Sequence, residues 1–328
     1  MSDDAKTPET EAENKEPEIT DEQPIVTQHQ MMLNGEVLSY TATTGMMPLK
    51  NDKGEIDANI FFMAYTLNDI EDRAERPLMF VFNGGPGSSS VWLHMGAFGP
   101  KRVKMEDEGW MPKPPFRLVE NDQTWLDKAD LVFIDPVGTG FSRAKDEETS
   151  KKYWSLKGDI ESIGEFIRMY LTRFGRWTSP LFLAGESYGT TRAAGIAGYL
   201  IDKGIAFNGV ILVSTVLNFQ TLRSMRGNDL PAYVYLPTYT ATAWYHKQLP
   251  DELQSKPLRD VLDEVEAWTE SDYAVAIAKG DRMSDEERAA VTEKLTYYTG
   301  LESKYIDGSN LRINIMRFCK ELLRDDKK

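Results

Sequence analysis

The segment Gly185-Glu186-Ser187-Tyr188-Gly189 is the part of this chain best suited to nucleophilic chemistry. It follows the apolar run LFLA and precedes a stretch with apolar residues at helical spacing. At such a strand-to-helix turn the tight backbone exposes the serine hydroxyl, which can then attack a carbonyl carbon. The pattern predicts Ser187 as the nucleophile and the backbone N–H of Tyr188 as a donor to the oxyanion. A chance Gly-Ser-Gly turn is the alternative, and the strand–turn–helix setting favours the nucleophile.

A second glycine-rich segment, NGGPGSS at residues 83–89, follows the apolar run PLMFVF. Glycine-rich turns can bind phosphate, but this one lacks both the Gly-Lys-Ser/Thr ending and the G-x-G-x-x-G spacing of nucleotide sites. A turn at this place can supply the second oxyanion N–H, and we assign that role to Gly85. A purely structural Gly-Pro turn stays open as the alternative.

Four short apolar runs, at 77–85, 131–140, 180–187 and 209–215, are the elements that must position these groups. Each run ends in small or polar residues, as expected of strands buried on both faces of a parallel sheet. Between the last three runs, residues 155–170 and 188–200 have apolar residues at helical spacing. The order predicts an α/β fold with a mostly parallel sheet, whose ligands bind at the carboxyl ends of the strands. Residues 31–45 and 59–67 predict antiparallel edge strands.

Three blocks in this order, FNGGPGSSS, FIDPVGTGFS and GESYG, resemble the signature blocks of the serine carboxypeptidase family. The resemblance extends over about residues 31–218. It implies an α/β-hydrolase fold: a mostly parallel sheet with crossover helices and a helical lid inserted after the nucleophile. It also implies a hydrolase that releases C-terminal residues from peptides through an acyl-enzyme, with no cofactor and no metal.

The resemblance also implies roles for individual residues. Ser187 attacks the carbonyl, and the N–H groups of Gly85 and Tyr188 bind the oxyanion. The groups implied to bind the substrate's C-terminal carboxylate are Asn83, Gly84 and Glu186. Two positions depart from the family pattern: Val81 replaces a tryptophan that helps to hold the carboxylate-binding pair, and Ser88 replaces a cysteine.

Glu186 beside a substrate carboxylate would place two like charges together, which is unfavourable unless the pair shares one proton. Protonated Glu186 would donate a hydrogen bond to the substrate, and the Asn83 amide would donate another. We therefore expect activity on free C-termini to be highest at acidic pH. Glu186 as a solvated surface carboxylate is the alternative.

The catalytic triad of this fold runs Ser, then Asp or Glu, then His along the chain. His246 is the only histidine after Ser187, and it lies in a helical segment rather than in a loop after a late strand. We do not expect it to be the base; His29 and His94 precede the nucleophile. Relative to the family, the chain is expected to lack its late strands, Asp and His. The sheet would then have an open apolar edge, and the 328-residue chain would be nearly inactive and prone to aggregate.

The expected domain organisation is a disordered acidic tail at 1–28, an α/β-hydrolase core at 29–218 and a helical lid at 219–328. Ser284 to Glu287 has the form of a capping box, and residues 309–325 predict a last helix. Trp244 and Tyr245 belong to an aromatic stretch that we expect to pack the lid onto the body of the fold rather than to line a substrate pocket.

The composition excludes several kinds of partner. The formal net charge of −14 and the lack of a basic stripe argue against nucleic acid and anionic lipid. The acidic N-terminus has no apolar run of a secretory signal, and no segment is apolar enough to span a membrane, so a cytoplasmic protein is expected. Cys319 is the only cysteine, which rules out an intrachain disulfide. No signal for an oligomeric state is present.

Two other functions stay open. The first is different acyl chemistry on the same scaffold, as in an esterase or acyltransferase, for which the substrate needs no free carboxylate. The second is a non-catalytic chain, a fragment or pseudoenzyme, which the missing late histidine supports. An esterase or acyltransferase would still use Ser187 as its nucleophile, whereas a non-catalytic chain would not.

Overall fold

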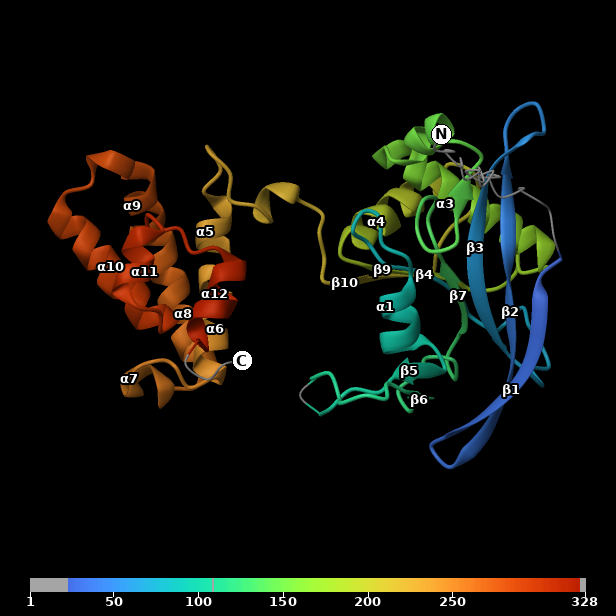
Figure 1. The fold of residues 1–328 in the computed structure, drawn as a ribbon, viewed down its shortest axis with the longest axis horizontal. Coiled ribbons are helices and arrows are strands. Elements are labelled where there is room, and N and C mark those ends of the chain that lie inside the picture. The colour runs from blue at the N-terminus through green and yellow to red at the C-terminus, as the bar shows by residue number, and fades with distance from the viewer. Residues whose placement is uncertain (1–22, 108, 325–328) are drawn as a thin grey trace, which may run out of the picture. The chain divides into compact units, whose positions relative to one another are not determined.

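The computed structural model describes residues 23–107 and 109–324. The chain divides after Leu217 into two units, one built on a β-sheet and one made of helices (Figure 1). The division lies one residue before the boundary expected from the sequence.

The first unit contains a mixed sheet with the strand order β1-β2-β3-β7-β4-β9-β10, in which β8 also pairs with β3. β1, β2 and β3 pair antiparallel, and β7, β4, β9 and β10 pair parallel. The predicted combination of antiparallel edge strands and a parallel centre is therefore confirmed, and the fold is that of an α/β hydrolase. The strands are β1 (Ile25–Leu33), β2 (Glu36–Lys50), β3 (Ile56–Leu67), β4 (Leu78–Phe82), β5 (Lys101–Val103), β6 (Leu118–Glu120), β7 (Asp130–Ile134), β8 (Arg143–Ala144), β9 (Leu181–Glu186) and β10 (Gly209–Val213), of which β5 and β6 form a separate hairpin.

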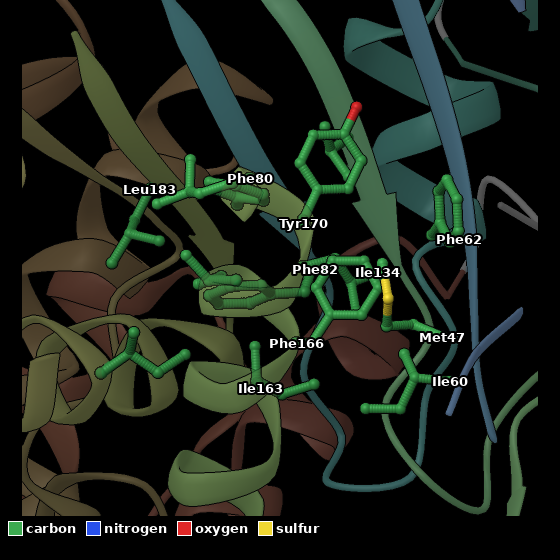
Figure 2. Close-up of a cluster of buried hydrophobic side chains, with 14 of the residues drawn as sticks. Met47, Ile60, Phe62, Phe80, Phe82, Ile134, Ile163, Phe166, Tyr170 and Leu183 are labelled. Atoms are coloured by element: carbon green, nitrogen blue, oxygen red, sulfur yellow. The ribbon is translucent and has the colours of Figure 1, made fainter. Parts of the chain in front are cut away.

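Both faces of the central strands are covered, because alternate side chains of each strand enter different cores. Phe80 and Phe82 of β4 pack with residues of α3 and α4, whereas Met79 and Val81 pack on the other face. Figure 2 shows the first of these cores, where Tyr170 of α3 meets the rings of Phe62 and Phe80 edge-on. Burying each such side chain contributes about 1.5 to 3 kcal/mol. The helical elements of this unit are α1 (Val91–Leu93), the π-helix η1 (His94–Phe98), α2 (Glu147–Tyr153), α3 (Leu156–Arg173) and α4 (Tyr188–Ile201).

The strand β10 corrects one expectation. Its sequence GVILV predicts a strand buried on both faces, but its residues alternate between half-buried and exposed. Among the described strands β10 pairs only with β9, so it forms an edge of the sheet. Val210 is 40% and Leu212 37% exposed. The predicted apolar edge strand is therefore present in the described structure.

The first strand corrects the predicted length of the acidic tail. β1 begins at Ile25 and pairs with β2 through a two-residue turn at Asn34 and Gly35, both with positive φ. An Asn-Gly turn fits the twist of a hairpin, and the nine-residue ladder that it starts extends back into the segment assigned to the tail. Residues 25–28 are therefore ordered strand, and residues 1–22 of the predicted tail lie outside the described residues.

The second unit has its own core, in which Tyr239 stacks on Phe318. The predicted capping box is confirmed: Ser284 Oγ accepts from the Glu287 N–H, and the Glu287 carboxylate accepts from the Ser284 N–H. Its helical elements are the 3₁₀ helix η2 (Phe219–Thr221), α5 (Leu230–Val234), α6 (Leu236–Tyr245), α7 (Asp251–Gln254), α8 (Leu258–Trp268), the π-helix η3 (Thr269–Tyr273), α9 (Ala274–Lys279), the 3₁₀ helix η4 (Gly280–Arg282), α10 (Asp285–Thr299), α11 (Ser303–Gly308) and α12 (Ile315–Leu322).

The single helix predicted over 309–325 is wrong. Asn310 and Leu311 both have positive φ, which interrupts any helix there. The last helix, α12, begins only after Asn314, whose side chain accepts from the N–H groups of Met316 and Arg317. Apolar residues occur at helical spacing on both sides of Asn310 and Leu311, but this spacing does not indicate that the backbone between them is left-handed. No described helix of the chain is both long and apolar enough to cross a bilayer.

Candidate active site

Ser187 lies between β9 and α4 in a strained backbone conformation, with φ of 56° and ψ of −125°. Its N–H donates to the carbonyl of Val213 (2.9 Å), and its carbonyl accepts from the N–H of Thr190 (2.9 Å). A Cβ added to Gly185 would lie 2.1 Å from the carbonyl oxygen of Gly189, and a Cβ added to Gly189 would lie 2.9 Å from the carbonyl oxygens of Phe82 and Asn83, so neither position accepts a side chain without a backbone shift. The predicted strand–turn–helix setting of the nucleophile is therefore present.

The glycine-rich loop after β4 packs directly against this turn. A Cβ on Gly84 would lie 2.5 Å from the backbone nitrogen of Tyr188 and 2.6 Å from the carbonyl oxygen of Glu186. Gly85 follows with φ of 104°, a conformation that favours glycine. Tyr188 is the first residue of α4, so its backbone N–H lies at the positive end of the helix dipole. The two N–H groups predicted for the oxyanion hole thus belong to backbone segments in close contact.

Asn83 and Glu186 are joined by a hydrogen bond, in which Asn83 Nδ2 donates to Glu186 Oε2 (3.0 Å). Asn83 is completely buried, and its Oδ1 accepts from the Leu93 N–H (3.0 Å), which fixes the orientation of the amide. Glu186 is half-buried. All six predicted site residues, at 83–85 and 186–188, are thus brought to the carboxyl ends of β4 and β9.

An open cavity of about 500 Å³ contains the nucleophile. Trp92, which is 71% exposed, lies at its rim. Larger cavities occur in the helical unit and on the sheet face lined by Met79, Trp125 and Phe182. Their linings lack a nucleophile next to oxyanion donors. The cavity is lined by Asn83, Gly85, Ser88, Trp92, Leu93, Glu186 and Ser187.

The second of the three sequence blocks, FIDPVGTGFS, supports the glycine-rich loop. Asp135, which follows β7, accepts a hydrogen bond from the Ser90 N–H (2.8 Å), and burial raises the pKa of this carboxyl group. The carboxylate occupies the space that a side chain at Gly140 would need. This block therefore fixes the C-terminal end of the glycine-rich segment 83–89, called the oxyanion loop below because Gly85 is predicted to supply an oxyanion donor. Sequence reasoning missed this role although it had singled out the block.

A buried ion pair contacts the start of the glycine-rich loop, and it was not predicted from the sequence either. Arg192, 1% exposed, binds the Asp159 carboxylate through Nε (3.0 and 2.9 Å) and the Asn83 carbonyl through Nη1 (2.6 Å). The Tyr188 hydroxyl hydrogen-bonds to the same carboxylate, and burial raises the pKa of Tyr188 to about 12, with Asp159 adding to the shift. From sequence alone, charged residues in helical segments are predicted to lie at the surface, so this buried pair was not expected.

The histidines have other contacts. His29 is exposed and hydrogen-bonds to Thr27, whereas His94 hydrogen-bonds to the Tyr65 hydroxyl (2.7 Å) and stacks on Phe133. His246 is an exposed residue at the C-terminal end of α6, in the helical unit. Neither histidine of the first unit bonds to Ser187. Within the described ranges no cluster of His, Cys, Asp or Glu could hold a metal ion.

Within the helical unit, Tyr239 and Trp244 of the aromatic stretch before His246 are packed, whereas Tyr245 is not. Tyr239 is buried there, and Trp244 Nε1 donates to the Lys256 carbonyl (3.3 Å). Tyr245 is 65% exposed.

Comparisons with known proteins find relatives that are named as carboxypeptidases. Pheromone-processing carboxypeptidase KEX1 of Saccharomyces cerevisiae is 34% identical over 156 residues, covering 44% of this chain and 20% of that protein. Serine carboxypeptidase-like 5 of Arabidopsis thaliana is 29% identical over 151 residues, covering 44% of this chain and 33% of that protein. The aligned region therefore spans between a fifth and a third of these curated relatives.

Among solved structures, the crystal structure of Kex1(delta)p, a prohormone-processing carboxypeptidase from Saccharomyces cerevisiae, matches 79% of this chain and 53% of that chain, with 23% identity and a TM-score of 0.48. The profile of the serine carboxypeptidase family matches residues 34–316, which is most of the chain. The three ordered blocks, the turn at Ser187 and this match lead to one conclusion: the chain belongs to the serine carboxypeptidase family.

Proposed function

We propose that this chain carries the nucleophile and the carboxylate-recognition groups of a serine carboxypeptidase, which releases the C-terminal residue of a peptide. The observation that carries the proposal is the Asn83–Glu186 hydrogen bond in the cavity that contains Ser187. An amide donor and a carboxyl group fixed beside a nucleophile suit a substrate with a carboxylate next to its scissile bond.

In the proposed reaction the Ser187 hydroxyl oxygen attacks the carbonyl carbon of the last peptide bond. The N–H groups of Gly85 and Tyr188 stabilise the oxyanion, and the C–N bond then breaks as the C-terminal amino acid leaves with the proton of the serine hydroxyl. Water hydrolyses the resulting ester, which releases the shortened peptide and restores the Ser187 hydroxyl. Asn83, Gly84 and Glu186 hold the substrate carboxylate. Two carboxyl groups side by side are unfavourable unless they share one proton, so we expect binding of the free acid to weaken as pH rises.

A serine hydroxyl needs a general base to react quickly. Neither His29 nor His94 bonds to Ser187. We therefore expect the 328-residue chain to bind peptides with a free C-terminus but to turn them over slowly. Binding is for this reason the more informative measurement.

The test compares a blocked dipeptide with its C-terminal amide, by calorimetry at mildly acidic and at alkaline pH. We expect the free acid to bind more tightly than the amide at acidic pH, by about tenfold for a charged recognition pair. Asn83→Ala should abolish this preference, and Glu186→Gln should retain it without the pH dependence. Asn121→Ala removes another buried asparagine and serves as the control.

Equal binding of acid and amide by the folded chain would contradict carboxylate recognition. Ser187-dependent cleavage of both an ester and a C-terminally amidated peptide would then support an esterase or acyltransferase. Acid-specific binding without any Ser187-dependent turnover would leave recognition standing for a chain that lacks its base.

A further inference from the structure

Arg192 contacts three parts of the first unit at once. It lies in α4 one turn after Tyr188, and its guanidinium group faces the rings of Phe82 and Tyr188 at 5.3 and 5.2 Å. Its Nε donates to both oxygens of Asp159 from α3, and its Nη1 donates to the carbonyl of Asn83 at the end of β4. The contacts join α3, α4 and the start of the oxyanion loop.

The chemistry of the guanidinium group suits this geometry. Its donors lie in a rigid planar fork, so a bond to Asp159 on one edge fixes the direction of the N–H that reaches Asn83. A buried ion pair gives little net stability over apolar packing, because both charges lose their hydration. The contribution of the Arg192–Asp159 pair is therefore to be sought in the groups that it positions rather than in stability.

The group positioned by the pair is the Asn83 backbone. The Asn83 side chain binds Glu186, and the next two residues are Gly84, which touches the turn at Ser187, and Gly85. A shift of the Asn83 carbonyl would move the carboxylate-binding amide and the Gly85 N–H together. The Asp159 carboxylate also receives the Tyr188 hydroxyl, so the same pair holds the residue that supplies the other oxyanion donor.

We propose that Arg192 and Asp159 are positioning residues, which hold the oxyanion loop and the carboxylate-binding pair in register with Ser187. The proposal rests on the proposed function for its effect on peptide binding, and on the contacts alone for its effect on the loop. It assigns neither residue a contact with the substrate.

A second buried pair in the same unit provides a matched control. Arg176, 3% exposed, donates to Asp130 Oδ2 (2.5 Å) through Nη1 and to the Arg76 carbonyl (2.9 Å) through Nη2. It has the same chemistry and similar burial, but none of its contacts reaches the loop after β4. Arg176→Lys therefore measures what loss of a buried guanidinium does to the fold alone.

The experiment compares the wild-type chain, Arg192→Lys and Arg176→Lys. Lysine keeps the charge at residue 192 but has a single nitrogen in place of the planar fork, so it cannot reproduce the arginine geometry toward both Asp159 and Asn83. The first measurement is the binding preference for a blocked dipeptide over its amide at acidic pH. The second is hydrogen exchange of the Leu93 amide in the unliganded proteins, because this amide donates to Asn83 Oδ1 and reports directly on its position.

For Arg192→Lys we expect most of the roughly tenfold preference for the free acid to be lost, since small misplacements of binding groups have large effects. Exchange at Leu93 should accelerate in this variant and remain near the wild-type rate in Arg176→Lys. Equal changes in the two variants, or none in either, would overturn the proposal.

If Arg192→Lys does not fold, Asp159→Asn takes its place. This variant leaves the guanidinium beside Asn83 but removes the charge that orients it, so a smaller loss in the same direction is expected. Wild-type preference and exchange in Asp159→Asn would overturn the proposal. If the wild-type chain shows no preference for the free acid, the proposed function fails, and the exchange rate at Leu93 decides on the positioning role by itself.

Discussion

The backbone N–H of Ser187 donates a hydrogen bond to the carbonyl of Val213, over 2.9 Å. Val213 is the last residue of β10, the strand at the edge of the described sheet. The nucleophile turn is thus tied on one side to an edge strand and on the other to the buried strand β4, through the contact of Gly84 with Tyr188. These ties hold Ser187 in a conformation that a residue with a side chain rarely adopts.

Replacing Ser187 by glycine should stabilise the chain. Glycine adopts a φ of 56° and a ψ of −125° without the steric cost that serine bears, which is about 1 kcal/mol or more. Ser187→Ala removes the same hydroxyl but keeps the Cβ, so it should leave the stability near that of the wild type. Denaturant unfolding of the three proteins measures the difference. A Ser187→Gly chain no more stable than Ser187→Ala would mean that the turn is not strained.

Gly84→Ala should be strongly destabilising. The new Cβ would lie within 2.7 Å of three backbone atoms, at Tyr188, Glu186 and Gly189, none of which can rotate away. We expect a loss of about 3 kcal/mol, at the upper end for overpacking, together with loss of peptide binding. Gly96→Ala is the control, because a Cβ there meets no atom within 4 Å. Equal stability of the two variants would contradict the close packing of loop and turn.

The stability of the first unit should fall in acid because of His94. Burial lowers the pKa of His94 to about 4, below the value of about 6.5 in an unfolded chain. Between these values the unfolded chain binds the additional proton, so the free energy of unfolding decreases as pH falls from 6.5 to 4. The expected decrease from this group is roughly 2 to 3 kcal/mol.

The variant His94→Gln tests this assignment. Glutamine remains neutral at every pH and can still bond to the Tyr65 hydroxyl, so the variant should show a flatter dependence of the unfolding midpoint on pH. His246→Gln, at an exposed position, should behave like the wild type. A pH dependence in His94→Gln as steep as that of the wild type would assign the loss to other groups.

Leu212→Lys should reduce self-association. Leu212 is exposed on the edge strand β10, and an edge with exposed apolar residues is a template for pairing with another chain. Sedimentation velocity over a range of concentrations should show less association for Leu212→Lys than for the wild type. Val26→Lys, at a 57% exposed site on β1, tests the opposite edge of the sheet for comparison. If both variants associate like the wild type, β10 is not the surface through which copies meet.

The central strands and the nucleophile turn could be predicted because their signals are local. The run LFLA before Gly185 and the helical spacing after Tyr188 lie within a few residues of the serine, and the structure has β9 and α4 there. The Asn-Gly turn at 34–35 is equally local. The tail was nevertheless predicted too long, because composition averages over a window and does not show where pairing with β2 begins.

The support of the site could not be predicted, because its contacts join residues far apart in the sequence. Asp159 and Arg192 are 33 residues apart, and Asn83 and Arg192 are 109 apart. Nothing near Arg192 indicates that its side chain points into the core rather than into water. Similarly, the half-exposed state of β10 depends on its having one described partner strand, which the apolar sequence GVILV does not show.

The contact between Gly84 and the turn at Ser187 also determines where this active site can be redesigned. Because backbone meets backbone there, no side chain can be introduced at 84, 185 or 189 without moving the nucleophile. Variation in substrate preference must therefore come from the rim, where Ser88 and the exposed Trp92 line the cavity. A library directed to those two positions would vary the rim of the candidate site while leaving the backbone around Ser187 intact, whereas substitutions at the glycines would displace that backbone and destabilise the chain.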